Sequence, residues 1–174
     1  FLALRDADVF EEARNLCVVF EGLHTYGGLA GRDLEAMAVG IHESLGEAHL
    51  AARIGQVISL GEQLHREGVP IVTPIGGHDV FVDAARFLPH LDAWQPQALA
   101  AALYLMSGVR ATATGLVGKD ALLPVQIPRL AMTNEQLDQV AEAIVGLHRQ
   151  RERVSPLHAV RTGTWEDQLQ FHWV

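Results

Sequence analysis

The feature that most constrains the fold is a change in hydrophobic period near residue 68. Residues 47–66 place apolar side chains three and four positions apart, the spacing of one face of a helix. Gly68 and Pro70 are expected to end that helix. Beyond them the apolar pattern alternates every second residue, which is typical of strands. A helix of about 20 residues spans roughly 30 Å, long enough to connect two parts of a larger protein.

Downstream of this point the sequence predicts a small mixed sheet with helices packed on it. Residues 69–72 and 79–83 are expected to pair as a hairpin across a turn rich in proline and glycine. A helix that has Pro96 near its first turn is expected to end at Gly108. The other elements expected here are a helical turn over residues 84–90, strands over 109–116, 125–129 and 169–174, and a helix from the Thr133–Gln136 capping box to residue 149.

Upstream, the pattern predicts a short helix, a strand, a glycine-rich loop and a second helix. The first helix has Asp6 or Asp8 as its N-cap, and residues 16–20 are short and β-branched, which favours a buried strand. The loop that follows places Gly27, Gly28 and Gly31 before an amphipathic helix over residues 31–45. A glycine turn between a strand and a helix is a common ligand position in α/β proteins, although a plain connecting loop fits the pattern equally well.

Composition excludes several classes of protein. The chain has 174 residues, 49% hydrophobic and 20% charged, as expected of a soluble globular domain. A net charge of −8 argues against nucleic acid as a partner, and no apolar run approaches a membrane span. Cys17 is the single cysteine, which favours a reducing, cytoplasmic setting. Nine histidines lack any paired metal-ligand spacing, so no metal site is expected.

Two features bear on chemistry. The chain begins at Phe1 and is expected to be a piece of a longer protein, and its only lysine is Lys119. Covalent chemistry on a lysine must therefore use Lys119 or a residue outside this chain. Arg129 follows Pro128 at the end of an apolar segment, a position suited to gripping a carboxylate through two parallel hydrogen bonds. A surface arginine remains an equal alternative on pattern alone.

Six segments in collinear order resemble the tryptophanase and tyrosine phenol-lyase family of pyridoxal-phosphate-dependent β-eliminating lyases. They are residues 16–41 (LCVVFEGLHTYGGLAGRDLEAMAVGI), 53–57 (RIGQV), 68–84 (GVPIVTPIGGHDVFVDA), 96–99 (PQAL), 107–110 (SGVR) and 127–129 (IPR). The resemblance implies an α/β protein of aspartate-aminotransferase type (fold type I), of which this chain is the C-terminal part. The domains it implies are the end of the large cofactor-binding domain (residues 1–45), a connecting helix (46–67), a small α+β domain (68–150) and a tail (151–174).

The resemblance also implies the site. Arg129 matches the arginine that binds the substrate α-carboxylate, and Tyr26 matches a catalytic tyrosine on the glycine loop. Leu23 matches a position that lines the leaving-group pocket. The cofactor, pyridoxal 5′-phosphate, would be held mainly by residues outside this chain, because the lysine that binds it is expected upstream of Phe1. Lys119 falls in a later loop and does not match that lysine.

Departures from the family pattern bear on the leaving group. Thr114 stands where phenol-lyases have an arginine and tryptophanases an aliphatic residue, so the phenol-recognising group is absent. His24 replaces a proline, Gln126 replaces a threonine, and the loop over residues 117–124 is shorter. These changes favour a sulfur leaving group, hence a C–S lyase acting on cysteine or an S-substituted cysteine, for example within a polyketide synthase. Past residue 155 the match fades, so Trp165 and His172 receive no role.

Two alternatives stay open: a C–C lyase of tryptophan or tyrosine, and a non-catalytic small domain kept for subunit contacts. The expected partners are the rest of the same polypeptide, a second or further copies in a homodimer or homotetramer, and a small amino-acid substrate.

Overall fold

The computed structural model describes residues 3–22, 29–114, 121–128, 131–161 and 170–173. The chain divides into two compact units, Phe1–Gly46 and Glu47–Val174. The described residues mix helices and strands, which confirms the α/β class in its coarse form. The finer division into domains stays a prediction. No helix among these residues is long and apolar enough to cross a membrane.

The first unit contains helices α1 (Ala7–Phe20) and α2 (Gly31–Glu43). The Asp6 carboxylate caps α1 by accepting hydrogen bonds from the backbone N–H groups of Asp8 and Val9, both at 3.0 Å. The strand predicted over residues 16–20 is wrong, because α1 continues through them. No residue of either helix is buried, so no neighbouring strand holds this β-branched run in an extended form. Cys17 is exposed on α1 and not inside a strand.

The second unit is organised around helix α3 (Glu47–Arg66), whose bounds match the prediction, and an antiparallel pair of strands. These are β1 (Asp79–Asp83) and β2 (Leu122–Gln126), in a register that pairs Val80 with Val125. Of the hairpin predicted for residues 69–72, a single bridge from Ile71 to Val82 is present. Two backbone hydrogen bonds flank this bridge, from the N–H of Val72 to the carbonyl of Phe81 at 2.8 Å and from the N–H of Asp83 to the carbonyl of Pro70 at 2.9 Å. Pro70 accepts in this way but has no N–H group to donate a further bond.

Two other strand predictions need correction. The predicted strand 125–129 begins earlier, at Leu122, because Pro124 lies inside β2 opposite Phe81 and does not end it. Of the predicted strand 109–116, the described residues 109–114 form one bridge, between Thr114 and Leu122. Both errors come from treating proline and β-branched residues as stronger local signals than cross-strand pairing.

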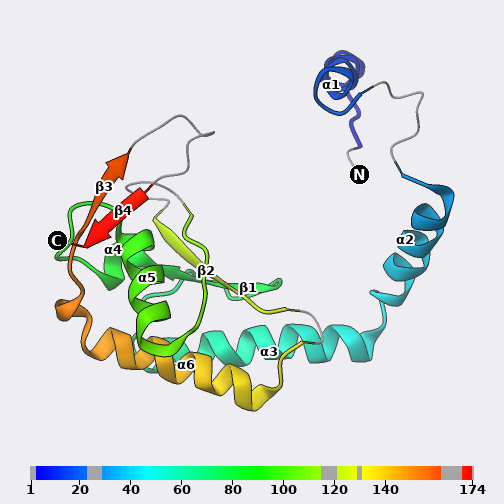
Figure 1. The fold of residues 1–174 in the computed structure, drawn as a ribbon. Helices are drawn as coiled ribbons and strands as arrows, with labels where there is room; N and C mark the ends of the chain where they lie inside the picture. The colour runs from blue at the N-terminus through cyan, green and yellow to red at the C-terminus, as the bar shows by residue number, and fades with distance from the viewer. Residues whose placement is uncertain (1–2, 23–28, 115–120, 129–130, 162–169, 174) are drawn as a thin grey trace. The chain divides into compact units, whose positions relative to one another are not determined.

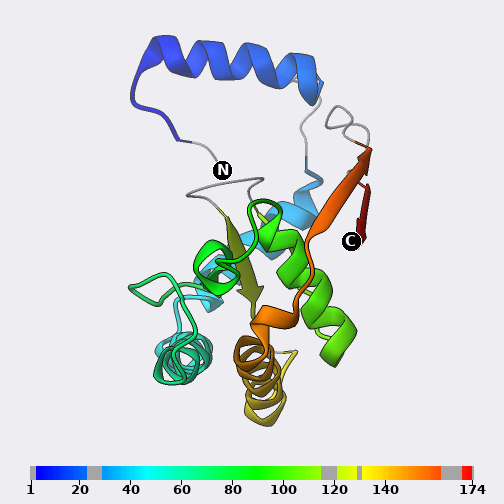
Figure 2. The same cartoon turned by 90° about the vertical axis from the view of Figure 1, so that its left-hand side faces the viewer.

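Helices α4 (Ala84–Phe87), α5 (Gln95–Ser107) and α6 (Asn134–Arg149) complete the core of this unit. Helices α3 and α6 run side by side, and α5 packs on α6 (Figures 1 and 2). Gly108 ends α5 with a φ of 76°, and the predicted capping box of Thr133 and Gln136 is present at α6. The largest fully buried side chains are Phe87, Leu60, Leu64, Leu88, Leu99, Leu103, Leu123, Ile144, Val57, Val69, Val80 and Val82.

The chain after α6 contains a short 3₁₀ turn, η2 (Arg151–Arg153), and a second antiparallel pair. Strand β4 (Gln170–Trp173) confirms the predicted C-terminal strand. Its partner β3 (Leu157–Arg161) was not predicted, because it falls in a stretch with no clear alternation.

Candidate functional site

Three of the four predicted site residues, Leu23, Tyr26 and Arg129, lie outside the described residues, as does Lys119. Their roles therefore stay predictions. Thr114 is described and exposed. Its hydroxyl donates a hydrogen bond to the carbonyl of Leu122 at 3.0 Å, and its backbone N–H donates to the same oxygen at 3.0 Å. Thr114 is thus tied to the edge of β2 and offers a neutral, already bonded hydroxyl.

The segment that leads into residue 129 is held by the start of β1. After β2, the backbone N–H of Ile127 donates to the carbonyl of His78 at 3.1 Å. Next to it, Nε2 of His78 lies 3.3 Å from Oδ1 of Asp79, and the carboxylate is 6% exposed while the imidazole is open to solvent. The turn rich in proline and glycine that the sequence predicts before residue 79 is present, with Gly77 at a φ of 74°. His78 follows this turn and faces the buried Asp79 carboxylate.

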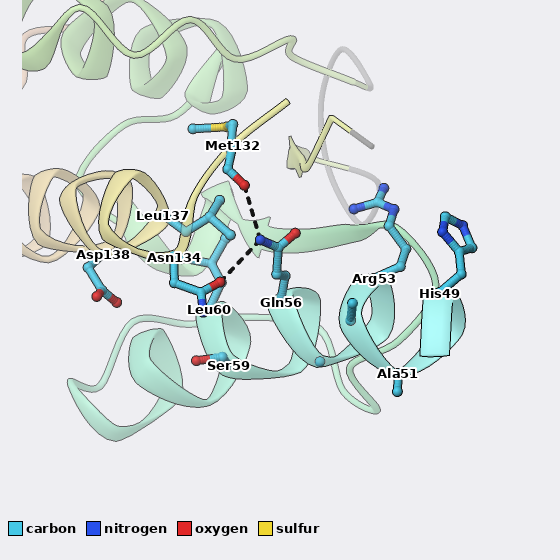
Figure 3. A pocket seen from close by; sticks show the side chains of 12 residues that line it. His49, Ala51, Arg53, Gln56, Ser59, Leu60, Met132, Asn134, Leu137 and Asp138 are labelled. Atoms are coloured by element: carbon cyan, nitrogen blue, oxygen red, sulfur yellow. Dashed lines mark hydrogen bonds between the residues drawn. The ribbon is translucent and has the colours of Figure 1, made fainter. Parts of the chain in front are cut away.

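A cavity of about 730 Å³ lies between the first half of α3 and the start of α6. The side chain of Gln56 crosses from one helix to the other, as Figure 3 shows. Its Nε2 donates to the carbonyl of Met132 and to Oδ1 of Asn134, each at 3.1 Å. Both amide hydrogens are therefore used, and the start of α6 is fixed against α3.

Two basic side chains lie at one end of this cavity. Arg53 and His49 extend from α3 in the same direction, and Asp138 lies at the opposite end (Figure 3). Nη1 of Arg53 is buried and has no hydrogen-bond partner among the residues that the structure describes. Sequence reasoning missed this residue as a site candidate, although it opens the RIGQV segment. An unpaired guanidinium is a property of the tertiary structure and leaves no mark on the local pattern.

Neither a metal site nor a lysine suited to the cofactor is found in the part of the chain that the structure describes. No group of three or more histidine, cysteine, aspartate or glutamate side chains gathers there. The described residues also include no lysine, since the only one in the sequence is Lys119. The described residues thus do not fit a covalently held pyridoxal phosphate.

The chain is similar to curated tyrosine phenol-lyases. It is 46% identical to the enzyme of Nostoc punctiforme over 92% of this chain and 38% of the relative. For the enzyme of Intrasporangium calvum the identity is 49% over 90% of this chain and 36% of the relative. For that of Fusobacterium nucleatum it is 45% over 92% and 38%. No protein-family model matches.

The chain thus spans little more than a third of the length of the curated relatives it matches. Within that span the match covers nine tenths of this chain's residues. The chain belongs to the tryptophanase and tyrosine phenol-lyase family, as a homologue of its C-terminal portion.

Proposed function

We propose that this chain is the C-terminal part of a pyridoxal-phosphate-dependent lyase that eliminates the β-substituent of an L-amino acid, giving pyruvate and ammonia. The observation that carries the proposal is the similarity to proteins named tyrosine phenol-lyase, at 45–49% identity over 90–92% of the chain. The fold proposed for the intact protein is that of the aspartate aminotransferases, with residues 68–150 as the small domain.

In this proposal the cofactor is held by the rest of the same polypeptide, and a lysine upstream of Phe1 binds it. The exposed apolar faces of α1 and α2 support a missing neighbour, because neither helix buries a residue. The large apolar side chains exposed there are Val9, Phe10, Leu16, Val19, Phe20, Leu34, Val39 and Ile41. Large apolar side chains exposed in this number support a contact with another part of the protein. Assembly into a dimer or tetramer is proposed from the resemblance alone.

The bond cleaved is proposed to be a C–C bond, with tyrosine as the substrate and phenol as the leaving group, because every relative reported above is named tyrosine phenol-lyase. The similarity does not support the sulfur leaving group expected from the sequence. One observation keeps C–S cleavage as a second candidate. Thr114 stands at the position where phenol-lyases have an arginine, and its hydroxyl is bonded within the sheet at 3.0 Å and carries no charge to meet a phenolate.

The residues of this chain would act on the substrate. Arg129 is proposed to bind the α-carboxylate through two parallel hydrogen bonds. Leu23 and Thr114 are proposed to line the leaving-group pocket, and Tyr26 to act beside it. The hydrogen bond from Ile127 to His78 would fix the backbone that delivers Arg129, because it anchors the residue two positions earlier.

The test is pyruvate release by the full-length protein with cofactor, offered tyrosine, tryptophan, cysteine and S-methylcysteine in parallel. Fastest turnover of tyrosine supports C–C cleavage, and fastest turnover of a cysteine substrate supports the second candidate. Absence of pyruvate from all four, in a preparation that shows cofactor absorbance near 420 nm, would refute the lyase proposal and favour a non-catalytic domain.

A variant tests Arg129 separately. Arg129→Ala is expected to raise KM by about two orders of magnitude for every substrate that is turned over, since it removes a bidentate ion pair. Arg66→Ala, at the exposed end of α3, is the matched control and should leave KM unchanged. Equal KM values for the two variants would remove Arg129 from the site.

A further inference from the structure

The described arginines differ in how their guanidinium groups are satisfied. Only Arg53 and Arg151 are half-buried among the arginines whose side chains are described. Arg151 donates from Nη1 to the carbonyl of His148 at 2.9 Å and lies beside Glu152. Arg53 has no such partner in the described chain, and its Nη1 is shielded from solvent. A buried charged donor without an acceptor costs free energy that an arriving acceptor would recover.

The space beside Arg53 has the size of a ligand site. At about 730 Å³ it falls within the range of small-molecule pockets. Its walls come from two helices that the Gln56 side chain fixes together through Met132 and Asn134, so the space exists before any ligand arrives. The Oδ1 atom of Asn134 accepts from Gln56, which leaves the amide hydrogens of Asn134 free to point elsewhere.

The charges along the cavity select the ligand. The positive charge of Arg53 stands at one end, beside His49, and the negative charge of Asp138 stands at the other (Figure 3). An anionic group is attracted to the first end, and a second anionic group would be repelled from the far end. Among biological anions, carboxylates and phosphates match the planar fork of a guanidinium.

We infer that the cavity between α3 and α6 is an oxyanion site, in which Arg53 binds the carboxylate or phosphate group of a small ligand. The site is separate from the lyase proposal, because it uses neither Arg129 nor Thr114. Its readouts involve no turnover, so the two proposals can fail independently.

The experiment is a titration of the ¹⁵N-labelled 174-residue chain, followed through the arginine Nε–H signals and the side-chain amide signals of Asn134. The probes are sodium acetate and sodium phosphate, with acetamide as the neutral control, at constant ionic strength. Saturable shifts of Arg53 and Asn134 are expected with one or both anions and not with acetamide. Saturation by acetate alone assigns a carboxylate site, and saturation by phosphate alone assigns a phosphate site.

Two variants make the result specific. Arg53→Gln should weaken the anion affinity at least about tenfold, while Arg66→Gln on the same helix should leave it unchanged. In Arg53→Gln the Arg53 signal is lost, so anion binding is followed through the side-chain amide signals of Asn134. Circular dichroism tests whether the variant keeps its helices. Shifts that grow linearly and equally at Arg53 and at exposed Arg32, or an affinity unaltered by Arg53→Gln, would overturn the proposal. An unfolded Arg53→Gln is replaced by Arg53→Lys, which must also lose affinity because it lacks the planar fork.

Discussion

Residues 1–46 and residues 47–174 hold their helices by different means. In the first unit, α1 and α2 have good local chemistry, including the Asp6 cap, yet none of their side chains is buried. In the second, α3, α5 and α6 enclose a core in which Phe87, Leu99 and Ile144 are almost completely inaccessible to solvent. Both units have amphipathic helices. The difference teaches that an apolar face predicts burial without saying which residues supply the other half of the contact.

The strongest test of this contrast is one substitution made in both units. Phe87→Ala removes a side chain that is 0% exposed and should lower the free energy of unfolding by about 3–5 kcal/mol, through lost burial and a cavity. Phe20→Ala removes one that is 77% exposed and should change it by no more than about 0.5 kcal/mol. Urea unfolding followed by circular dichroism measures both. Similar losses for the two variants would show that α1 is packed as firmly as the core.

The same contrast explains what the sequence could predict. Elements set by short-range chemistry were found: the ends of α3, the Thr133 capping box and the Gly108 stop all depend on residues within one turn. Elements set by a distant partner were missed. Residues 16–20 lack the sheet that would extend them, and β3 is a strand only because β4 pairs with it.

The candidate site residues show the same contrast between local sequence signals and tertiary contacts. The family resemblance nominated Arg129, Tyr26, Leu23 and Thr114 from linear motifs. Nη1 of Arg53 is buried without an acceptor in the described part of the chain, and no local pattern in the sequence contains that information. The burial of Asp79 was equally hidden, because alternation along β1 places it with exposed Phe81.

A second test concerns close packing against α3. A Cβ atom at Gly61 would lie 2.7–2.9 Å from three side-chain atoms of Ile75, so Gly61→Ala must displace that residue. The clash should outweigh the better helix propensity of alanine and destabilise the second unit by about 1–2 kcal/mol. Gly55→Ala, on the same helix, meets nothing within 4 Å and should stabilise by about 0.5–1 kcal/mol.

Thermal unfolding of the two variants gives melting temperatures that should move in opposite directions. A higher melting temperature for both variants would mean that the Ile75 side chain moves away from the new methyl group at little cost. Gly40→Ala in α2 also has open space around it and extends the comparison to the first unit. It should raise the helix content of α2 while leaving the unfolding of the second unit unchanged.

A third test compares helix caps, which act locally in both units. Thr133→Ala removes the hydroxyl that accepts from the backbone N–H of Gln136 at 3.3 Å and should cost the second unit about 1 kcal/mol. Asp6→Ala removes a cap of similar geometry from α1. Because α1 buries nothing, its loss should appear as reduced helicity and not as a lower midpoint for the second unit. If Asp6→Ala lowered the unfolding midpoint of the second unit as much as Thr133→Ala does, the two units would not unfold independently.

The smallest expected effect is a pH dependence that belongs to the core of the second unit. Burial lowers the pKa of His148 from 6.5, and the nearby charge of Arg151 lowers it further. Its imidazole packs edge-on against Phe87, with ring centroids 4.9 Å apart. The folded chain thus favours the neutral ring, and the unfolded chain binds a proton more readily.

Stability should therefore fall as the pH drops below about 6.5 and stop responding to His148 once the pH is below its folded-state pKa. His148→Gln should flatten this part of the plot of unfolding free energy against pH, measured by urea unfolding. The free energy of unfolding that the variant loses at pH 8 gives the packing cost of the substitution. At pH 8 both states hold a neutral ring, so any difference there is not electrostatic. If His148→Gln leaves the slope of unfolding free energy against pH unchanged between pH 7 and pH 5, the folded chain accommodates a protonated His148. The burial that distinguishes the helices of the second unit from those of the first would then not reach the end of α6.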